Sequence, residues 1–580
     1  MKIRTPYLVM FLLFVVLGVY YPSLFAPFNT VDDRGMINAL LNFDHFSLKD
    51  IFFPGENGYY YRPLLSLTFI ADNFLWGQQP SFMHLENILI HAVNTLLVFF
   101  IAGEISKRYG VQNSLLSLSA SLLFALHPIN TEPVNWISGR TDLLAALFIL
   151  LSTFLLLRAL ATESKVLSAL ASSSFLLSCL AKDSAIFFFP AVILIIWHTD
   201  VSGESLFSSF YASLKKRFFF FSSYSFAVIT YFTFRHIAFA KADSGISTAA
   251  QGVIGHNARF LYTLKVILKL LGFYVKKLFF PMPLNFAISG ASDYYIPLGI
   301  IIIIVCLYLI YRRDLVADLF LASICVVSPA FLVALNRMAW TPIAERYLYI
   351  PAATFAIGMA FSVFFLCRRF NWGKVLPLFA VMLYVTSAYA TVERNFVWQD
   401  NLTLFQDTIR KSPGYPPIIN ELALALKDHG RNAEGDAMLM TNSMGKNAKN
   451  KEFCDLNRAA LLCGVGDFKS ARRLLLDNLN PSSAIYPQIL LKLANVDGRL
   501  LEQAASIQEK EQIRKELISM LKKLQDNTGD PYFLYRLGQQ FLFAGEKTEA
   551  QKYFAKAYEA APEGAHYKMA AKKLAEKLKQ

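Results

Sequence analysis

Two adjacent carboxylates, Asp32 and Asp33, follow the first hydrophobic segment of the chain, in the stretch PFNTVDDRGMINALLNF. Carboxylates at the mouth of a membrane helix are costly to place near hydrocarbon, and residues kept there at such a cost often serve a function. A carboxylate can take the proton of an acceptor hydroxyl as a general base. We therefore predict Asp33 and Asp32 as catalytic residues, with Asp33 favoured as the base.

Further polar residues are expected at the same surface of the membrane. Arg140 can hold a phosphate through two parallel N–H···O contacts. Cations near a departing phosphate stabilise the charge that develops on it. The candidates for binding the phosphate or lipid of a donor are Arg140, Arg346, Lys182 and Arg62. The candidates for binding substrate are His84, Asn87, His91, His127, Glu132, Trp136 and Glu345, and the same surface also carries Asp142, Asp183 and Arg337.

His84, Asn87, His91 and Asn94 follow one another at helical spacing, so they form a stripe on one helix face. At about 1.5 Å per residue the stripe reaches roughly 15 Å into the membrane, where polar groups must face protein or water. Hydrogen bonding between helices is the alternative to substrate binding. A plain Glu–Arg pair is likewise the alternative for Glu345 and Arg346, and an interfacial anchor is the alternative for Trp136.

Several chemistries have no sequence support. Walker, dinucleotide-binding, nucleophile-elbow and HExxH motifs are all missing from the sequence. The six cysteines show no CxxC or Cys/His metal spacing, although Cys454 and Cys463 are close enough in sequence for a disulfide. We expect no metal and no required cofactor. A divalent ion bridging the Asp pair and a donor phosphate is the alternative.

The composition is that of a membrane protein, with 55% hydrophobic residues and a mean hydropathy of +0.39. An all-α chain with about eleven membrane spans is predicted. The expected spans are 7–25, 86–103, 113–127, 142–157, 166–180, 184–198, 218–234, 294–311, 317–335, 346–366 and 375–392.

The net charge of +14 is explained by the connections between these spans, so nucleic acid is not expected as a partner. With the N-terminus in the cytoplasm, every cytoplasmic connection is basic, as the positive-inside rule requires. These residues are Lys2, Arg4, Lys107, Arg108, Arg158, Lys165, Lys215, Lys216, Arg217, Arg312, Arg313, Arg368, Arg369 and Lys374. We expect a multi-pass protein of the bacterial inner membrane with a periplasmic C-terminal domain.

Hydropathy falls sharply near residue 393, which divides the chain into a membrane domain, 1–395, and a helical domain, 396–580. Residues 531–564 follow the tetratricopeptide pattern at Leu534, Leu537, Gly538, Phe541, Gly545, Ala550, Phe554, Ala557 and Pro562. Three or four such units form a small solenoid whose groove typically binds peptide or protein. A merely structural dock is the alternative.

An amphipathic segment covers 259–280, where Lys265, Lys269 and Lys276 share one helix face and Lys277 lies beside them. This pattern predicts an interfacial helix lying on the membrane, with lysines near lipid phosphates.

Taken together, the chain resembles the transmembrane-and-tetratricopeptide-repeat O-mannosyltransferases and, more distantly, protein O-mannosyltransferases of the GT-C fold. The stretches that carry the resemblance are VDDRGMI, YYRPLLSLTFIADNFLWGQQPSFMHLENILIHAVN, LFALHPINTEPVNWISGRTDLL, CLAKDSAIFFFP and AERYLYIP. It implies a GT-C-type core, Asp32-Asp33 as the catalytic motif and a polyprenyl-phosphate sugar as donor. The short repeat array favours a bacterial relative.

The sequence therefore predicts an integral membrane glycosyltransferase. It would move a mannose-like hexose from a polyprenyl-phosphate carrier to a hydroxyl of an extracytoplasmic acceptor, favouring Ser or Thr of a protein recruited by the repeats. A transferase for surface polysaccharide or lipid is the first alternative, and a non-catalytic scaffold that displays repeats is the second. A transporter is disfavoured, because the charges collect at one surface rather than at the membrane midplane.

Overall fold

The computed structural model describes residues 4–33, 48–53, 61–111, 113–199, 205–239, 260–336, 341–371, 376–413, 415–441, 451–483, 485–561, 565 and 567–579. Secondary structure in these ranges is helical, and the bridge between Ile288 and Ile343 is their one β contact. The prediction of an all-α fold is confirmed.

The chain divides into two compact units, Met1–Ile418 and Ile419–Gln580. The boundary predicted at 395/396 falls inside helix α19 (Leu376–Trp398), which belongs to the first unit together with α20 (Asn401–Lys411). Arg394 of α19 pairs with Asp407 of α20 at 2.5 Å, so these two helices are also joined electrostatically.

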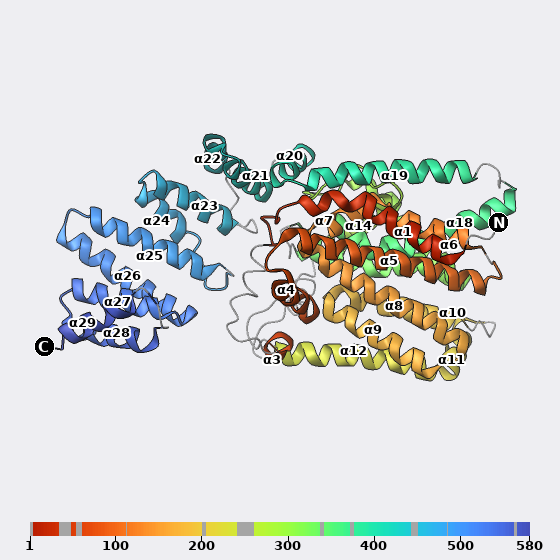
Figure 1. Ribbon diagram of the computed structural model, residues 1–580, viewed down its shortest axis with the longest axis horizontal. Coiled ribbons are helices and arrows are strands. Elements are labelled where there is room, and N and C mark those ends of the chain that lie inside the picture. Colours follow the sequence, from red (N-terminus) through yellow and green to blue (C-terminus); the bar gives the residue numbers. More distant parts are fainter. Residues whose placement is uncertain are drawn as a thin grey trace. The chain divides into compact units, whose positions relative to one another are not determined.

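The helices of the first unit run mostly along one direction and pack side by side (Figure 1). The longer ones are α1 (Thr5–Tyr20), α4 (Pro63–Trp76), α5 (Pro80–Arg108), α6 (Ser114–Ala125), α8 (Arg140–Thr162), α9 (Lys165–Ala181), α10 (Phe189–Thr199), α11 (Leu206–Lys216), α12 (Phe218–Ala238), α14 (Phe260–Phe279), α15 (Ile296–Arg312), α16 (Leu315–Val327), α17 (Pro329–Asn336) and α18 (Tyr349–Phe370). The shorter ones are η1 (Tyr21–Phe25), α3 (Leu48–Phe52), η2 (Pro128–Asn130), α7 (Thr131–Asn135), η3 (Ile137–Gly139), η4 (Asp183–Phe188), η5 (Asp293–Tyr295) and η6 (Glu345–Leu348).

Six helical segments of the described chain are long and apolar enough to cross a membrane: Thr5–Phe25, Pro80–Arg108, Ile137–Thr162, Asp293–Arg312, Leu315–Leu335 and Glu345–Phe370. The chain is thus a multi-pass membrane protein. Each of the eleven expected spans falls on a helix. Three are shorter apolar helices, Ser114–Ala125, Lys165–Ala181 and Asp183–Thr199, and the remaining two fall on α12 and α19.

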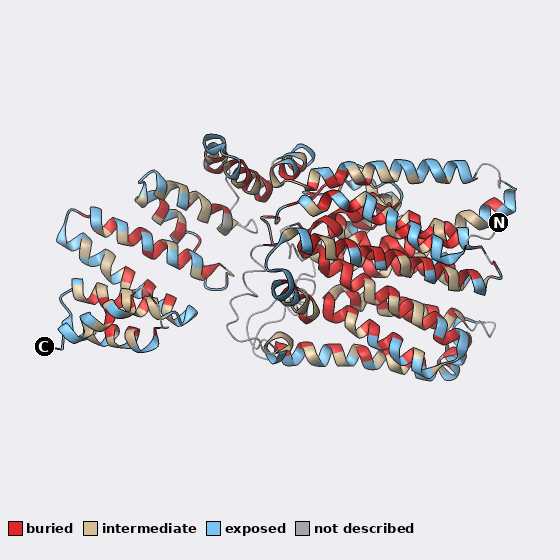
Figure 2. Cartoon of the chain, viewed as in Figure 1, coloured by how far each residue is buried: buried red, intermediate tan, exposed pale blue. Residues whose placement is uncertain are grey.

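The core of the first unit lies between α5, α8, α9, α16 and α18, whose facing sides are buried (Figure 2). Ala145, Ala146, Ala352, Ala353 and Ala356 are buried on α8 and α18. Small residues let membrane helices approach closely. In lipid no hydrophobic driving force brings helices together, so the van der Waals contacts of this close approach stabilise their packing.

Helix α14 covers nearly all of the segment predicted as an interfacial helix, but its second half is packed into the protein. A Cβ atom on Gly272 would lie 2.2 Å from the Tyr295 carbonyl oxygen, and one on Gly299 would lie 2.0 Å from that of Leu268. Two glycines thus let α14 and α15 touch backbone to backbone. The expectation that Lys277 lies near lipid phosphates is wrong, because its side chain is buried.

The second unit is a succession of helices: α21 (Pro416–Asp428), which bridges the boundary, α22 (Asn432–Thr441), α23 (Lys451–Gly464), α24 (Phe468–Leu476), α25 (Tyr486–Gln503), α26 (Ile507–Thr528), α27 (Pro531–Phe543), α28 (Lys547–Ala560) and α29 (Lys568–Lys577). Helices α27 and α28 meet where Gly538 faces the Phe554 ring, and Gly545 turns the chain between them at φ +82°. Cys454 and Cys463 are both free thiols.

Candidate active site

The Asp33 carboxylate is buried, with 1% of its surface exposed, and is not accessible from solvent. Its Oδ2 accepts the Asn29 backbone N–H at 2.8 Å, and its Oδ1 accepts both the backbone N–H and the hydroxyl of Ser138, at 3.0 and 2.5 Å. Burial raises the pKa of Asp33 to about 6, against the opposing effect of these hydrogen bonds. The carboxylate ties the segment after η1 to the η3 turn.

Ser138 reaches Asp33 because residues 133–139 fold back on themselves. A Cβ atom on Gly139 would lie 2.5 Å from the Pro133 carbonyl oxygen, so only glycine fits at that position. Sequence reasoning did not identify Ser138 or Asn29. The role of Ser138 depends on a contact between residues 105 positions apart, for which the WISGR stretch gives no local signal. Asn29 contacts Asp33 locally, through its backbone N–H.

Asp32 differs from its neighbour in remaining exposed. It nevertheless has many atoms around it, and this partial desolvation raises its pKa. The opposing influence comes from the positive charges of Arg346 and Arg62, which lower the pKa. Asp32 is therefore an accessible carboxylate with two guanidinium groups in its electrostatic surroundings.

Arg346 is the best-placed cation near Asp32. Its Nη1 contacts Glu132 Oε1 at 2.8 Å, its Nη2 donates to Thr341 Oγ1 at 2.7 Å, and its guanidinium lies 5.1 Å from the ring centres of both Trp136 and Tyr347. Burial raises the pKa of Glu132 to about 7, although Arg346 opposes that shift. The two aromatic rings hold the guanidinium plane while part of the side chain, 12%, stays exposed.

Lys182 and Arg62 complete a group of cations with Arg346. Lys182 pairs with Asp142 at 2.5 Å and lies 5.7 Å from the Tyr347 ring centre. Burial lowers the pKa of Lys182, Asp142 raises it, and the charges of Arg62 and Arg346 lower it. Arg62 lies 3.7 Å from Asp183. Asp32, Arg62, Lys182 and Arg346 lie on four segments that are distant in sequence. The fold thus brings their charges into one region.

Arg140 lies outside this group, in a closed cluster. Its Nη1 contacts Asp72 at 2.6 Å and Glu86 at 3.0 Å, while its Nε and Nη2 donate to Asn87 Oδ1 and to the Met83 carbonyl. The side chain is completely buried. All three nitrogens are therefore engaged by the protein, and the structure does not place Arg140 where a donor phosphate could reach it.

The polar stripe on α5 is buried, and three of its side chains form hydrogen bonds to neighbouring segments of the bundle. Asn87 donates to the Trp136 carbonyl at 2.9 Å, His91 Nδ1 contacts the Tyr349 hydroxyl at 2.7 Å, and Asn94 donates to the Leu143 carbonyl at 3.0 Å. His84 lies against the backbone of Ala26 and Pro27. The alternative of hydrogen bonding between helices thus accounts for Asn87, His91 and Asn94.

His127 and Glu345 also have internal partners. His127 Nε2 contacts the Leu278 carbonyl at 3.0 Å, and its Nδ1 accepts the Ile129 N–H at 3.2 Å, which fixes the neutral ring. Burial likewise lowers its pKa. Glu345 pairs with Lys277 at 2.6 Å, and both side chains are 4% exposed. Glu345 and Arg346 thus do not pair with each other, because each has a different partner.

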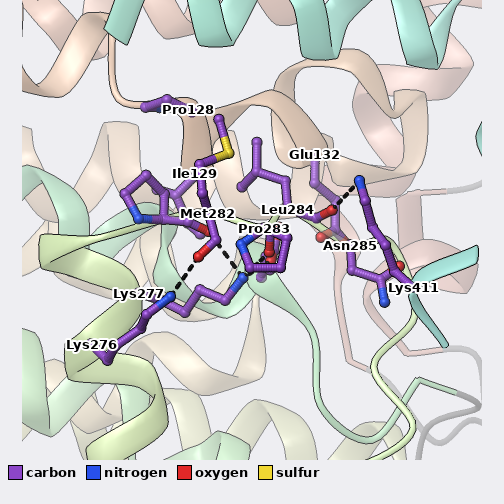
Figure 3. A network of polar contacts seen from close by, with 12 residues as sticks. Pro128, Ile129, Glu132, Lys276, Lys277, Met282, Pro283, Leu284, Asn285 and Lys411 are labelled. Carbon is purple, nitrogen blue, oxygen red and sulfur yellow. Dashed lines mark hydrogen bonds and ion pairs between the residues drawn. The ribbon is translucent and has the colours of Figure 1, made fainter. Parts of the chain in front are cut away.

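Lys277 also closes the loop that follows α14 (Figure 3). Its Nζ donates to the carbonyls of Pro281 and Pro283, and Lys411 of α20 donates to the Leu284 carbonyl at 2.8 Å. The bridge between Ile288 and Ile343 joins this loop to the segment that carries Thr341 and Arg346. Sequence reasoning placed Lys277 on a lipid face, so this contact was missed.

In the described part of the chain, no three His, Cys, Asp or Glu side chains are grouped so as to hold a metal ion. This leaves the expectation of a metal-independent reaction untested. Arg337 lies outside the described residues.

The fold and this site together define a polytopic helical membrane protein with an accessible carboxylate near three cations. No protein-family model matches the chain. Among curated proteins it is similar to the human protein O-mannosyl-transferase TMTC1, with 42% identity over 93 residues, 16% of this chain and 10% of the relative. It is also similar to the human protein O-mannosyl-transferase TMTC4, with 41% identity over 101 residues, 16% of this chain and 14% of the relative.

A longer match is to a protein O-mannosyl-transferase of Caenorhabditis elegans, with 25% identity over 384 residues, 64% of this chain and 51% of the relative. The resemblance to this family is thereby confirmed. The matched region spans about half of the nematode relative and far less of the human ones.

Proposed function

We propose that this protein is a membrane glycosyltransferase that moves a mannose-like hexose from a polyprenyl-phosphate carrier to a hydroxyl of an extracytoplasmic acceptor, in particular Ser or Thr of a protein. The observation that carries the proposal is the exposed Asp32 carboxylate in the field of Arg346 and Arg62. The relatives named as protein O-mannosyl-transferases support the same reaction class.

Asp32 is the general base of the proposed reaction. Its pKa is raised by its crowded surroundings, which brings the carboxylate closer to the basicity that proton abstraction needs. The acceptor oxygen attacks the anomeric carbon as its proton passes to Asp32, and the bond from that carbon to the phosphate oxygen breaks. The electron pair of that bond leaves with the phosphate.

Arg346 and Arg62 receive the phosphate, and Lys182, which is buried against Asp142, contributes through its charge alone. The charge on the leaving oxygen grows as the bond breaks, and fixed cations stabilise that charge more in the transition state than in the bound donor. Asp33 acts through the backbone: its three hydrogen bonds to Asn29 and Ser138 hold Asp32 in place. Asp33 is thus a positioning residue, and the base role assigned to it from sequence passes to Asp32.

The remaining parts of the proposal concern location and acceptor. The N-terminus is cytoplasmic and the repeat unit is periplasmic in the bacterial inner membrane, with the catalytic end of the helices at the outer surface. The helices of unit 419–580 form tetratricopeptide repeats that bind the protein acceptor. The packing of Gly538 against Phe554 and the buried Ala550 support this assignment.

The test is sugar transfer in reconstituted membranes with radiolabelled polyprenyl-phosphate hexoses and a cell-envelope protein extract. Asp32→Asn is expected to lower transfer by about 10²- to 10⁴-fold, the usual worth of a general base, with unchanged thermal stability. Asp33→Asn is expected to lower both stability and transfer, because an amide cannot accept all three hydrogen bonds. EDTA is expected to leave transfer unchanged.

Wild-type rates in Asp32→Asn would overturn the base assignment. Label appearing only in polysaccharide or lipid fractions added in parallel would replace the protein acceptor. Absence of transfer from every donor would favour the non-catalytic scaffold.

A further inference from the structure

Helix α11 (Leu206–Lys216) lies at the end of the helix bundle where α5 finishes, and it packs against α10 and α12 (Figure 1). The candidate span Pro80–Arg108 ends there with Lys107 and Arg108, and basic residues at the end of a membrane helix lie among the lipid headgroups. Arg108 donates to the Thr199 carbonyl at 2.9 Å, so the end of α10 lies at the same membrane surface.

Helix α11 is held against the last turn of α10. Trp197 Nε1 donates to Ser209 Oγ at 3.2 Å, and the Trp197 and Phe210 rings meet edge to face with 5.3 Å between their centres. The Ser213 hydroxyl donates to the Ile196 carbonyl at 3.5 Å. The helix has 11 residues and is therefore about 16 Å long, roughly half the thickness of a bilayer core. It is thus fixed at the membrane surface and is too short to cross the membrane.

The two faces of α11 have inverted polarity. Ser209 and Ser213, four positions apart, face the protein and are 0% and 1% exposed. Phe207 and Tyr211, also four positions apart, lie on the opposite face and are 90% and 70% exposed. A helix that covers a protein in water buries its apolar face and exposes its polar face. The reversal in α11 indicates that the surroundings of its outward face are apolar.

The exposed apolar surface continues on the next helix. A single residue separates α11 from α12, the helix on which the expected span 218–234 falls. Large apolar side chains that α12 exposes are Phe218, Phe219, Phe226 and Ile229. The lipid expected around α12 therefore also borders α11, which favours lipid over a protein partner as the cover of α11.

We propose that α11 lies in the boundary between the headgroups and the acyl chains of the membrane, with Phe207 and Tyr211 inserted among the lipid chains. Aromatic side chains concentrate at this depth in membrane proteins. Lys215 follows Tyr211 by four positions and is exposed, and its long side chain extends from the apolar boundary to the headgroups. The partner of this surface is the lipid bilayer, and the proposal does not depend on the transfer reaction.

The experiment measures the surroundings of position 207 in the full chain, reconstituted into phosphatidylcholine liposomes. A nitroxide label is attached to Phe207→Cys. Electron paramagnetic resonance then compares the collisions of the label with O₂, which is more soluble in lipid, and with a water-soluble nickel chelate. The signal of the labelled wild-type chain, which has six cysteines, is subtracted.

Two matched positions serve as references. Phe14→Cys lies on α1, within the candidate span Thr5–Phe25, and is the lipid-facing reference. Val465→Cys lies in the second unit and is the reference outside the spans. The wild-type side chains at these positions are 76% and 73% exposed, so the three labels start from similar exposure to their surroundings.

The ratio of O₂ to nickel collisions at position 207 is expected to exceed the ratio at 465 and to fall below that at 14. The reason is that an interfacial helix lies less deep than the middle of a spanning helix. Tyr211→Cys repeats the measurement at a second exposed position, and an unchanged thermal unfolding midpoint shows that each labelled chain is folded.

A ratio at positions 207 and 211 equal to that at 465 would overturn the proposal, because α11 would then face water. Few collisions with either reagent would overturn it too, because protein would then cover this face. In that case, loss of dipolar broadening on dilution with unlabelled chain would identify the cover as a second copy of the protein.

Discussion

Arg140 and Arg346 are both arginines at the start of a membrane helix, and both are predicted from sequence to meet a donor phosphate. In the folded chain they belong to different kinds of cluster. Arg140 is completely buried between Asp72 and Glu86, and the protein engages each of its nitrogens. Arg346 lies against Trp136 and Tyr347 with part of its surface exposed, and its charge acts on the exposed Asp32.

This difference shows that a fully buried charge stabilises the fold, whereas a partly exposed charge can bind a ligand. Breaking a fully buried ion pair leaves an uncompensated charge in a poorly solvated place, so such a residue governs stability. When the partner of a partly exposed cation held by aromatic rings is changed, the folded protein loses less stability. Such a cation can also receive an anion. Arg140 and Arg346 should therefore separate stability from transfer.

Among the variants that test this comparison of the two arginines, Arg346→Gln is expected to have the largest effect. Removing a cation that stabilises the leaving phosphate lowers kcat by about 10²- to 10³-fold, the usual worth of one such group. The thermal midpoint should change little in the double variant Glu132→Gln/Arg346→Gln, which removes both charges of the pair. Steady-state transfer and thermal unfolding measure the two properties, and a normal kcat in either variant would contradict a role for Arg346 in catalysis.

Arg140→Gln is expected to show the reverse pattern. It leaves the buried Asp72 and the partly exposed Glu86 without their cation, at a cost of about 3 kcal/mol or more in the free energy of unfolding. Adding Asp72→Asn should restore part of that loss. Transfer per folded molecule should stay near wild type, so a large fall in kcat with unchanged stability would place Arg140 in the reaction after all.

Lys277→Met and Lys276→Met test the same principle on neighbouring residues. Lys277 is buried against Glu345 and the loop carbonyls, whereas Lys276 is only half-buried and donates to the Met282 carbonyl (Figure 3). We expect Lys277→Met to cost about 2 kcal/mol or more, and Lys276→Met to have a much smaller effect. Equal losses in chemical unfolding of the two variants would show that burial does not distinguish them.

The smallest effect concerns pH. Glu132 has a pKa raised to about 7, so it becomes protonated as the pH falls below 7 and no longer neutralises Arg346. A phosphodiester donor stays ionised over this range, so its KM should fall several-fold between pH 8 and pH 6. Glu132→Gln should abolish this dependence. A KM that rises on acidification would contradict the assignment.

The same raised pKa carries a stability consequence of definite sign. The folded state holds the Glu132 proton up to about pH 7, while the unfolded chain releases it near its ordinary value. The unfolded state therefore binds fewer protons between these limits, and the contribution of Glu132 to stability is lost as the pH rises through that window. Glu132→Gln should flatten this part of the stability profile.

The sequence alone determined the helical membrane fold and the residue types at the candidate site. Runs of apolar residues predict where helices lie because hydropathy and length are local properties, and each expected span falls on a helix. The prominence of Asp32, Asp33, Arg62, Lys182 and Arg346 also came from local composition, because charge is rare and costly at membrane level.

Only the tertiary structure decided which of these charges are already satisfied. Arg140 meets Asp72, Arg346 meets Glu132, and Asp33 meets Ser138 across 68, 214 and 105 positions of sequence. No local pattern encodes such a meeting, since it follows from how the helices pack. The adjacent carboxylates Asp32 and Asp33 therefore differ in accessibility, because neighbouring side chains at a turn point to different surroundings.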